Sequence, residues 1–489
     1  MKKIILLVIL GILLIISIPN AQAIDISNCT TLDTPNSIYY LTGAAENHTT
    51  CMLVSANNVT LDCQGHTLNH SLQGILGVGH GVYSNQNLTT VRNCVILEGE
   101  PGGTGKDGIH FLNVNNGTIF NNTITTLELN CRGIYLQSSY DINVSNNNVT
   151  QIALPGSTTV GIFIWSSSNN SFLGDKVTNR RPDFYGVEFY GDSTNNSFSG
   201  ISIDTNSSGA YPFNIYIGNH NFTVRDSILN ASYNGVPELY IRSEVTGGSW
   251  NFTNVTKTDG SSLNISWGTG ANGTLNVFWY LDINVSTSAG APIQNANVTV
   301  RDVNNTELFS VLTAADGTIT TQTIQEYWRN GTTAVYYTNL TINTTIPGYN
   351  SDETEVNLSS NKQTDITLTS PETTSPDNVG FLSPTPSNHT NLTQNNYFVN
   401  VSFNDSFPQW CELELTNTSG TINYTMTQGA NSSEYYFNVT GQSNYLTYFV
   451  AYCNDTSGNW NNSETRFVCL LYTSPSPRDR QRSRMPSSA

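Results

Sequence analysis

The sequence predicts an all-β protein in which a solenoid of stacked β-coils is followed by two β-sandwich domains. Between about residues 61 and 256 a Gly-apolar-x-apolar step recurs, with intervals of 27, 25, 28 and 25 residues between the glycines at Gly81, Gly108, Gly133, Gly161 and Gly186. About ten residues after each step comes a second motif, apolar-x-Asn/Gly-x-x-apolar, as in residues 91–96. A fixed period in this range with strand-like alternation indicates coils that bury their apolar faces against one another.

The two ends of the chain differ from the rest. Lys2 and Lys3, an apolar run over residues 4–18 and Ala21-Gln22-Ala23 are typical of a secretory signal peptide, so we expect residues 1–23 to be a cleaved leader. An uncleaved membrane anchor is the alternative, although the run is short for a span. Residues 469–489 resemble a translated sequencing-library adaptor, with a basic disordered tail as the alternative. We therefore expect the native C-terminus, and any membrane attachment through it, to be missing.

Composition indicates an exported glycoprotein. The formal net charge is −17, and an acidic surface repels phosphate backbones, so nucleic acid is not an expected partner. The chain carries 35 Asn-x-Ser/Thr sequons, which are glycan acceptors in exported proteins. Abundant Asn and Thr with little Lys favour a secreted or cell-surface protein of an archaeal cell.

Cysteine usage agrees with export, because disulfides persist in oxidising compartments. No CxxC or Cys/His cluster is present, which disfavours zinc, and we expect no metal or cofactor. Three disulfides are expected, and Cys131 is left over as a buried thiol; the pairs are Cys411 with Cys453, Cys63 with Cys94, and Cys29 with Cys51.

The solenoid is expected over residues 24–270, with residues 24–60 as an N-terminal cap. The Asn of the second motif (Asn93, Asn121 and Asn146) should recur coil on coil, either as a hydrogen-bonded ladder or through ordinary turn chemistry. These coil motifs, with the opening run over residues 58–68, resemble the right-handed parallel β-helix family, in its pectate-lyase-like and periplasmic copper-protein-like surface-protein branch. The resemblance covers residues 28–256.

Two further domains follow. Strands and turn signals at short spacing over residues 277–369 indicate a β-sandwich that resembles the non-catalytic carboxypeptidase-regulatory-like domain. Residues 370–378 form a Pro/Ser/Thr-rich linker. Residues 379–468 resemble an immunoglobulin-like sandwich in which a Cys–Cys bridge joins the two sheets.

Enzymes occur among β-helix proteins, but the coil acids do not pair well. A glycoside hydrolase of the inverting type needs two carboxylates about 6.5–9.5 Å apart. Asp107 and Glu188 are three coils apart, about 14 Å at the coil spacing. Asp183, Glu188 and Asp192 share one coil without a demonstrable common face. Gly79-His80-Gly81 resembles a short polygalacturonase motif, yet the paired acids and basic motif of that family are missing.

A polysaccharide lyase needs a base beside a cation. Its candidates are Lys106, Asp107, His110 and Arg132, or Arg180 and Arg181 with Asp183. Asp107 and Arg132 precede the glycine in adjacent coils, so a structural salt bridge between them is the simpler interpretation. The sequence therefore favours a non-catalytic protein, with a lyase or glycoside hydrolase as the alternative.

A column of residues gives the stronger functional clue. The middle residue of each Gly step should face outward, because its neighbours face the core. Reading down the coils, these residues are Tyr83, His110, Tyr135, Phe163, Glu188, Tyr216 and Tyr240. Exposed rings about 5 Å apart would form a platform for sugar rings, which Trp165 would extend; alternatively, the stacked rings only stabilise the sheet. We expect binding of glycans, neighbouring cells or S-layer components, with a purely structural surface protein as the other alternative.

Overall fold

The computed structural model describes residues 21–72, 79–99, 105–127, 130–152, 159–179, 184–370, 375–405, 407–442 and 446–471. Every regular element among them is a β-strand, which confirms the all-β class. The described residues form two compact units. The first holds the chain up to Asp282 together with Thr321–Leu340 and Asn357–Gln363, and the second holds the remainder. The expected leader lies almost wholly outside the described residues, as does the adaptor-like tail beyond residue 471.

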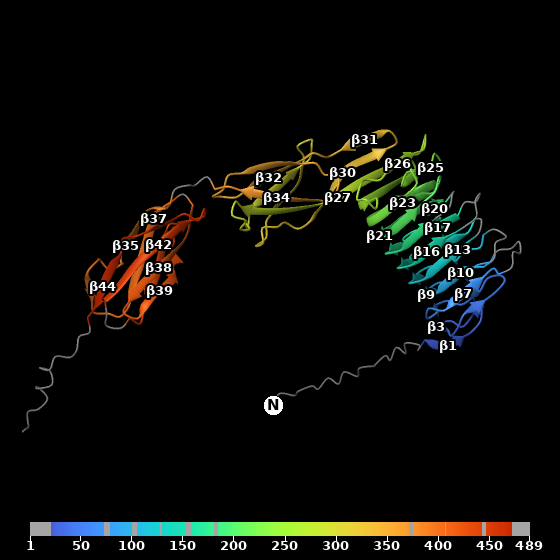
Figure 1. Cartoon of the computed structure of the whole chain (residues 1–489), viewed down its shortest axis with the longest axis horizontal. Coiled ribbons are helices and arrows are strands. Elements are labelled where there is room, and N and C mark those ends of the chain that lie inside the picture. Colours follow the sequence, from blue (N-terminus) through green and yellow to red (C-terminus); the bar gives the residue numbers. More distant parts are fainter. Residues whose placement is uncertain are drawn as a thin grey trace, which may run out of the picture. The chain divides into compact units, whose positions relative to one another are not determined.

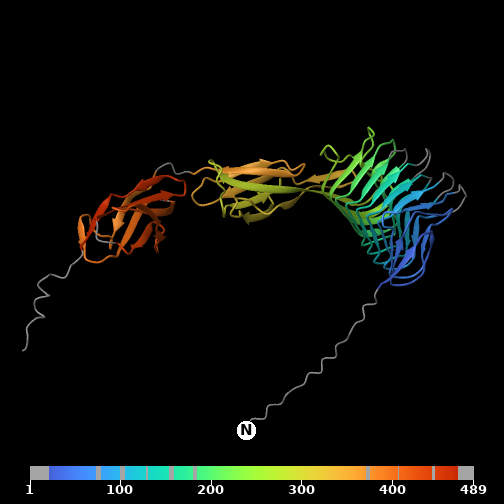
Figure 2. The ribbon, with the colours of Figure 1, turned by 60° about the horizontal axis from the view of Figure 1, so that its bottom comes forward.

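The first unit is a solenoid in which each coil adds one strand to each of three parallel faces (Figures 1 and 2). The first face consists of β2 (Thr30–Leu32), β5 (Met52–Val54), β8 (Val82–Ser84), β11 (Ile109–Leu112), β14 (Arg132–Gln137), β17 (Thr159–Trp165), β20 (Phe184–Tyr190), the start of β23 (Tyr211–Ala231), β24 (Leu239–Ile241) and β26 (Ile265–Trp267). The second face consists of β1 (Gln22–Ile26), β3 (Ser37–Leu41), β6 (Val59–Asp62), β9 (Thr90–Arg92), β12 (Thr118–Phe120), β15 (Asn143–Ser145), β18 (Ser171–Leu173), β21 (Ser193–Ser199), the middle of β23, β25 (Val245–Thr256) and β27 (Thr274–Thr287). The third face consists of β4 (Ala45–Glu46), β7 (Thr67–His70), β10 (Val95–Glu98), β13 (Thr123–Thr126), β16 (Asn148–Gln151), β19 (Lys176–Asn179), β22 (Ser202–Thr205) and the end of β23.

The recurring glycine of each coil is required by space. A Cβ on Gly133 would lie 2.2 Å from Val149 Cγ1 and 2.7 Å from the carbonyl oxygen of Gly161 in the next coil. Gly108 meets Ile124 Cγ2 and the Gly133 carbonyl oxygen in the same way, at 2.4 and 2.6 Å. The glycine column therefore lets the first face approach the buried β-branched residues of the third face.

The Asn of the second motif takes a turn conformation at all three positions, and one pair also forms a ladder bond. Asn93, Asn121 and Asn146 have positive φ values of 55°, 52° and 54°, a conformation that Asn tolerates at turns. The amides also bond from coil to coil, because Asn121 Nδ2 donates to Asn93 Oδ1 at 2.8 Å.

A second amide ladder lies one residue further on and is buried. Asn122 Nδ2 donates to Asn147 Oδ1 at 2.9 Å, and Asn147 Nδ2 donates to Asp175 Oδ1 at 2.9 Å. Each Nδ2 also donates to a backbone carbonyl of the preceding coil, that of Val91 for Asn122 and that of Ile119 for Asn147. This ladder satisfies polar groups inside the solenoid that would otherwise be costly to bury.

The N-terminal residues are already coils. β1 pairs in parallel with β3, and β3 with β6, so the segment expected as a cap continues the repeat. Two disulfides join strands and turns of neighbouring coils, Cys29–Cys51 and Cys63–Cys94, and Cys131 is a buried thiol. At the other end, β27 pairs in parallel with β25 and antiparallel with β30 (Gln322–Asn330), which forms a hairpin with β31 (Thr333–Tyr336). This hairpin belongs to the first unit although its residues fall within 277–369.

The second unit consists of antiparallel sheets and one short parallel pairing. A four-stranded sheet contains β28 (Asn297–Arg301), β29 (Glu307–Leu312), β32 (Leu340–Thr345) and β33 (Asp352–Val356), while β34 (Lys362–Leu368) pairs with β27. One later sheet contains β35 (Asp377–Leu382), β37 (Tyr397–Asn404), β40 (Thr427–Gln428) and β41 (Glu434–Val439). The other contains β36 (Thr390–Leu392), β38 (Pro408–Asn417), β39 (Gly420–Thr425), β42 (Leu446–Asp455), β43 (Trp460–Asn462) and β44 (Arg466–Leu470).

The third disulfide differs from the expected arrangement. Cys411 and Cys453 are bonded, but they face each other on the adjacent strands β38 and β42 of one sheet. The expectation of a bridge between two sheets was therefore wrong. Alternation along each strand places both cysteines on the core side, and that pattern alone does not tell cross-strand partners from cross-sheet partners.

Candidate functional site

The first face carries the expected column of residues, with one correction. Strand register aligns Tyr83, His110, Tyr135, Phe163, Glu188, Asn214 and Tyr240 in successive coils. Asn214 therefore takes the place expected for Tyr216. Phe213 and Ile215 are the buried residues on either side of it, and the register shifts directly after Phe189. The coil that contains Asn214 lacks the Gly step. Without that marker, the sequence prediction placed the column residue two positions further on, at Tyr216.

Most of this column is buried, which contradicts the expected exposed platform. Tyr135 is 4% exposed and Phe163 is 6% exposed. The two rings form a small apolar cluster with Val160 and Tyr185, against which Tyr190 and Tyr211 pack. The aromatic residues at these positions therefore stabilise the outer side of the sheet, and only Tyr83 and Tyr240 at the ends of the column are half-buried.

A different aromatic row is accessible. Trp165 and Tyr190 end β17 and β20, and Tyr216 lies in β23 one coil further on. The Trp165 and Tyr190 ring centroids are 5.3 Å apart, and those of Tyr190 and Tyr216 are 5.4 Å apart. Trp165 is 36% exposed, and both tyrosines are half-buried. We call Trp165, Tyr190 and Tyr216 the aromatic row.

Arg242 lies at one end of the aromatic row. Its Cζ is 4.5 Å from the centre of the Tyr216 ring and is also close to the rings of Tyr185 and Tyr240. Its Nε donates to Asn214 Oδ1 at 3.2 Å, and Asn214 Nδ2 donates to Glu188 Oε1 at 3.1 Å. Burial raises the pKa of Glu188 to about 7, against the opposing charge of Arg242.

A polar cluster lies several coils earlier on the same face. Asp107 Oδ2 is 3.3 Å from His80 Nδ1 and 3.6 Å from His110 Nδ1. Asp107 Oδ1 accepts the backbone N–H of Arg132 at 3.0 Å and lies 3.7 Å from the Arg132 guanidinium. His80, Asp107 and His110 are all buried. The sequence candidates Asp107, His110 and Arg132 therefore do converge.

The ionisation states in this cluster follow from burial and neighbouring charge. Burial opposes ionisation of Asp107, but the His80 side chain and the charges of Arg132 and His110 outweigh it and hold the pKa of Asp107 below its usual value. Burial lowers the pKa of His110 to about 4. Lys106, the fourth candidate, is buried beside Asp107 in the chain. The other expected set, Arg180, Arg181 and Asp183, lies outside the described residues.

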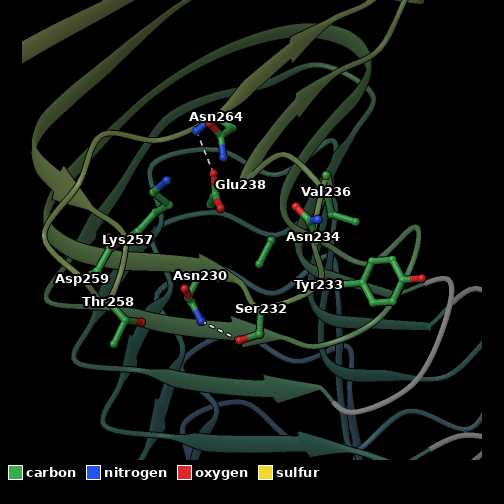
Figure 3. A pocket seen from close by; sticks show the side chains of 12 residues that line it. Asn230, Ser232, Tyr233, Asn234, Val236, Glu238, Lys257, Thr258, Asp259 and Asn264 are labelled. Atoms are coloured by element: carbon green, nitrogen blue, oxygen red, sulfur yellow. Dashed lines mark hydrogen bonds between the residues drawn. The ribbon is translucent and has the colours of Figure 1, made fainter.

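The last coils form a separate pocket with a cavity volume of about 520 Å³ (Figure 3). Loops 231–236 and 257–264 line it, and Tyr233, Lys257 and Asp259 stand at its rim. Glu238 is buried at its wall, where it accepts the backbone N–H of Asn264 at 2.7 Å. This acid is thus engaged by the backbone, and the pocket shares no residue with the aromatic row or the polar cluster.

Comparison with protein families agrees with the stacked coils. The family model described as a right handed beta helix region matches residues 14–203 and, in a second overlapping match, residues 80–240. The described coils in this stretch form a right-handed β-helix. The match confirms the predicted family for the coils but does not extend to the second unit.

Solved structures resemble this chain only weakly. The gp42 tailspike of an Acinetobacter phage aligns over 69% of this chain and 76% of its own, with 12% identity and a TM-score of 0.33. A putative carbohydrate binding protein from Bacteroides uniformis aligns over 39% of this chain and 98% of its own, with 11% identity and a TM-score of 0.16. No curated protein matches the chain significantly.

Sequence reasoning missed several residues of the β-helix face. His80 precedes its coil glycine just as Asp107 and Arg132 precede theirs, and this shared position was the available signal. Asn214, Arg242 and Tyr190 carry no comparable signal, because their coils depart from the Gly step or place the residue at a strand end. In the part of the chain that the structure describes, no helix is long and apolar enough to cross a membrane.

Proposed function

We propose that this chain is a secreted or cell-surface protein whose β-helix binds carbohydrate, without catalysis, through the aromatic row. One observation carries the proposal: rings from three successive coils stand in contact at 5.3 and 5.4 Å and remain accessible to solvent. Aromatic faces present large apolar area at little entropic cost, so they suit the apolar faces of sugar rings. Arg242 at the end of the row adds a cation and hydrogen-bond donors.

The setting supports an extracellular role. Three disulfides are typical of proteins from oxidising compartments, and the sequons are numerous enough for extensive glycosylation. Glycans of neighbouring cells or surface-layer components are the partners that we propose. The second unit then serves as a spacer or adhesion module.

The experiment is a glycan array on the full chain, followed by titration with the glycans that bind. Trp165→Ala and Tyr216→Ala should each weaken binding about 5-fold or more, because losing one aromatic ring that packs on a sugar ring costs about 1 kcal/mol. Tyr140→Ala is the matched control, since Tyr140 is 39% exposed on the same unit but outside the row. Equal affinity in the wild type and both row variants would refute the aromatic row as the binding surface.

A lyase or glycoside hydrolase is the second candidate, favoured by the convergence of Asp107, His110 and Arg132. The pKa of Asp107 lies below its usual value, which argues against this residue as a general base at neutral pH, because a carboxyl with a lowered pKa accepts a proton less readily. Turnover of pectin-like and alginate-like polymers tests this candidate. Cleavage by the wild type that is lost in Arg132→Ala would establish it over the non-catalytic proposal.

A further inference from the structure

The polar cluster on the early coils has a feature that salt bridging does not explain. His110 Nε2 lies 3.2 Å from Gln137 Oε1, an oxygen that can only accept, so Nε2 carries the proton in this contact. His110 Nδ1 then presents a lone pair. Among the described residues this buried nitrogen has no hydrogen-bond partner, and it lies 3.6 Å from the carboxylate oxygen Asp107 Oδ2.

His80 is placed similarly. The backbone N–H of Asp107 donates to His80 Nδ1 at 3.4 Å, so Nδ1 is the unprotonated nitrogen of this ring, and an ion at the site would replace this long contact. His80 Nδ1 is 3.3 Å from Asp107 Oδ2, and one ligand atom from each of the three residues lies within 4.8 Å of the others. A carboxylate oxygen and one nitrogen from each of two imidazoles therefore lie together in a buried site. A cation between them, or a proton on one imidazole, removes the repulsion between the carboxylate oxygen and His110 Nδ1.

We propose that His80, Asp107 and His110 bind a divalent transition metal ion of the zinc class. Two donor atoms bound to one such ion at about 2.0–2.1 Å are separated by about 3.3–3.5 Å in tetrahedral geometry. Of the two separations from Asp107 Oδ2, 3.3 Å lies in this range and 3.6 Å is slightly longer. Two imidazoles and one carboxylate suit zinc and its neighbours, whereas calcium and magnesium require mainly oxygen ligands.

The surroundings hold all three ligands in place. Asp107 Oδ1 is anchored by the backbone N–H of Arg132, which leaves Oδ2 for the ion. The His110 ring stacks on Tyr135 with centroids 4.2 Å apart, and the His80 ring stacks on Tyr83 at 5.5 Å. Gln137 is the outer partner that metal-bound histidines normally have, because it fixes the tautomer and the ring orientation. Three protein ligands leave at least one coordination position for water.

The nearby cation Arg132 allows the metal site to be separated from a structural salt bridge. If Asp107 serves only as the ion-pair partner of Arg132, the variant Arg132→Gln leaves the Asp107 carboxylate without a role. If Asp107 binds metal, Arg132→Gln keeps the backbone donor and removes a repulsive charge. We therefore expect Arg132→Gln to bind zinc at least as tightly as the wild type.

The experiment measures Zn²⁺ binding to the tag-free full chain after treatment with a chelator, by isothermal titration calorimetry, with Ca²⁺ as the comparison ion. The expected result is one Zn²⁺ per chain, no heat with Ca²⁺, and a higher thermal transition when Zn²⁺ is present. His110→Ala and Asp107→Asn should weaken Zn²⁺ binding about 100-fold or more, and Gln137→Ala about 10-fold. His66→Ala, which alters a half-buried histidine outside the site, should bind as the wild type does.

Co²⁺ substitution provides a readout that does not depend on unfolding. The wild type should develop the visible absorption of low-coordinate Co²⁺, and His110→Ala should not, while circular dichroism shows that both are folded. Absence of Zn²⁺ binding by the wild type, or the same affinity in His110→Ala, would overturn the proposal. The outcome is independent of glycan binding, because the metal ligands and the aromatic row share no residue.

Discussion

At the residue scale, the buried ladder of amides ends on an acid. Asp175 Oδ1 accepts two hydrogen bonds from Asn147, one from its backbone and one from its side chain. Asp175 Oδ2 has no hydrogen-bond partner among the described residues, and burial raises the pKa of Asp175 to about 6. An Asn here would continue the ladder, because its Nδ2 could donate to a backbone carbonyl of the preceding coil, as those of Asn122 and Asn147 do.

Asp175→Asn should therefore stabilise the β-helix at neutral pH by about 1–3 kcal/mol. Since the pKa of Asp175 is higher in the folded chain, its stabilising contribution is full below about pH 4 and is lost as the pH rises through 6. The gain in the variant should follow that loss: it should be large at pH 7.5 and nearly absent at pH 3.5. Thermal unfolding at both pH values measures it, with Asp192→Asn at an exposed site as the control. A gain that does not change with pH would contradict this account.

At the element scale, a glycine at or near the start of several first-face strands lets each of these strands pack closely against the third face and the next coil. Gly108 lies directly before β11, and Gly133 is the second residue of β14. Each is enclosed by a buried side chain of the third face and by a carbonyl of the next coil. The same close approach positions the residue just before the glycine. His80, Asp107 and Arg132 all hold that position in adjacent coils, so the element geometry assembles the polar cluster.

Gly133→Ala tests this constraint. The added Cβ would meet Val149 Cγ1 and the Gly161 carbonyl, so the coils must separate, at a cost of about 1–3 kcal/mol for an overpacked core. Chemical denaturation should show the loss as a lower midpoint. Gly43→Ala is the matched control, because a Cβ there meets nothing within 4 Å and should change stability by less than about 0.5 kcal/mol. Equal effects at both glycines would show that space is not the cause.

At the scale of the whole molecule, stability is distributed along the coil stack. Each coil contacts mainly its neighbours, so a bond between two coils supports the local part of the solenoid most strongly. Cys63–Cys94 closes a loop with a sequence separation of 31 and joins successive coils of the β-helix. Cys411–Cys453 lies in the second unit and leaves the β-helix untouched.

The Cys63→Ala/Cys94→Ala double variant should lose about 4 kcal/mol, the value for a closed loop of this length. Calorimetry of the full chain should show a lower transition temperature for the β-helix and an unchanged transition for the second unit. The Cys411→Ala/Cys453→Ala variant should show the reverse. A shift of both transitions in either variant would mean that the two units do not unfold independently.

Prediction from sequence worked where the physics is local and repeated. Strand alternation and a constant period identify the coils, because every coil must bury the same positions. Asn93, Asn121 and Asn146 identified the turns, since few other residues adopt positive φ easily. The predicted column was wrong at Asn214. The start of β23 lacks the Gly step, and the register between β20 and β23 shifts after Phe189, which the sequence of neither strand alone reveals.

The sequence by itself determined that this protein stacks β-coils, which residues point toward its core, and that Asp107 and Arg132 meet across adjacent coils. Only the tertiary structure decided which aromatic residues reach solvent. It buried Tyr135 and Phe163 and left Trp165 accessible, because exposure depends on what neighbouring coils place over each ring. It also brought His80 to Asp107 and His110. The atoms that would share one ion come from two coils, and their separations follow from strand register rather than from spacing along the chain.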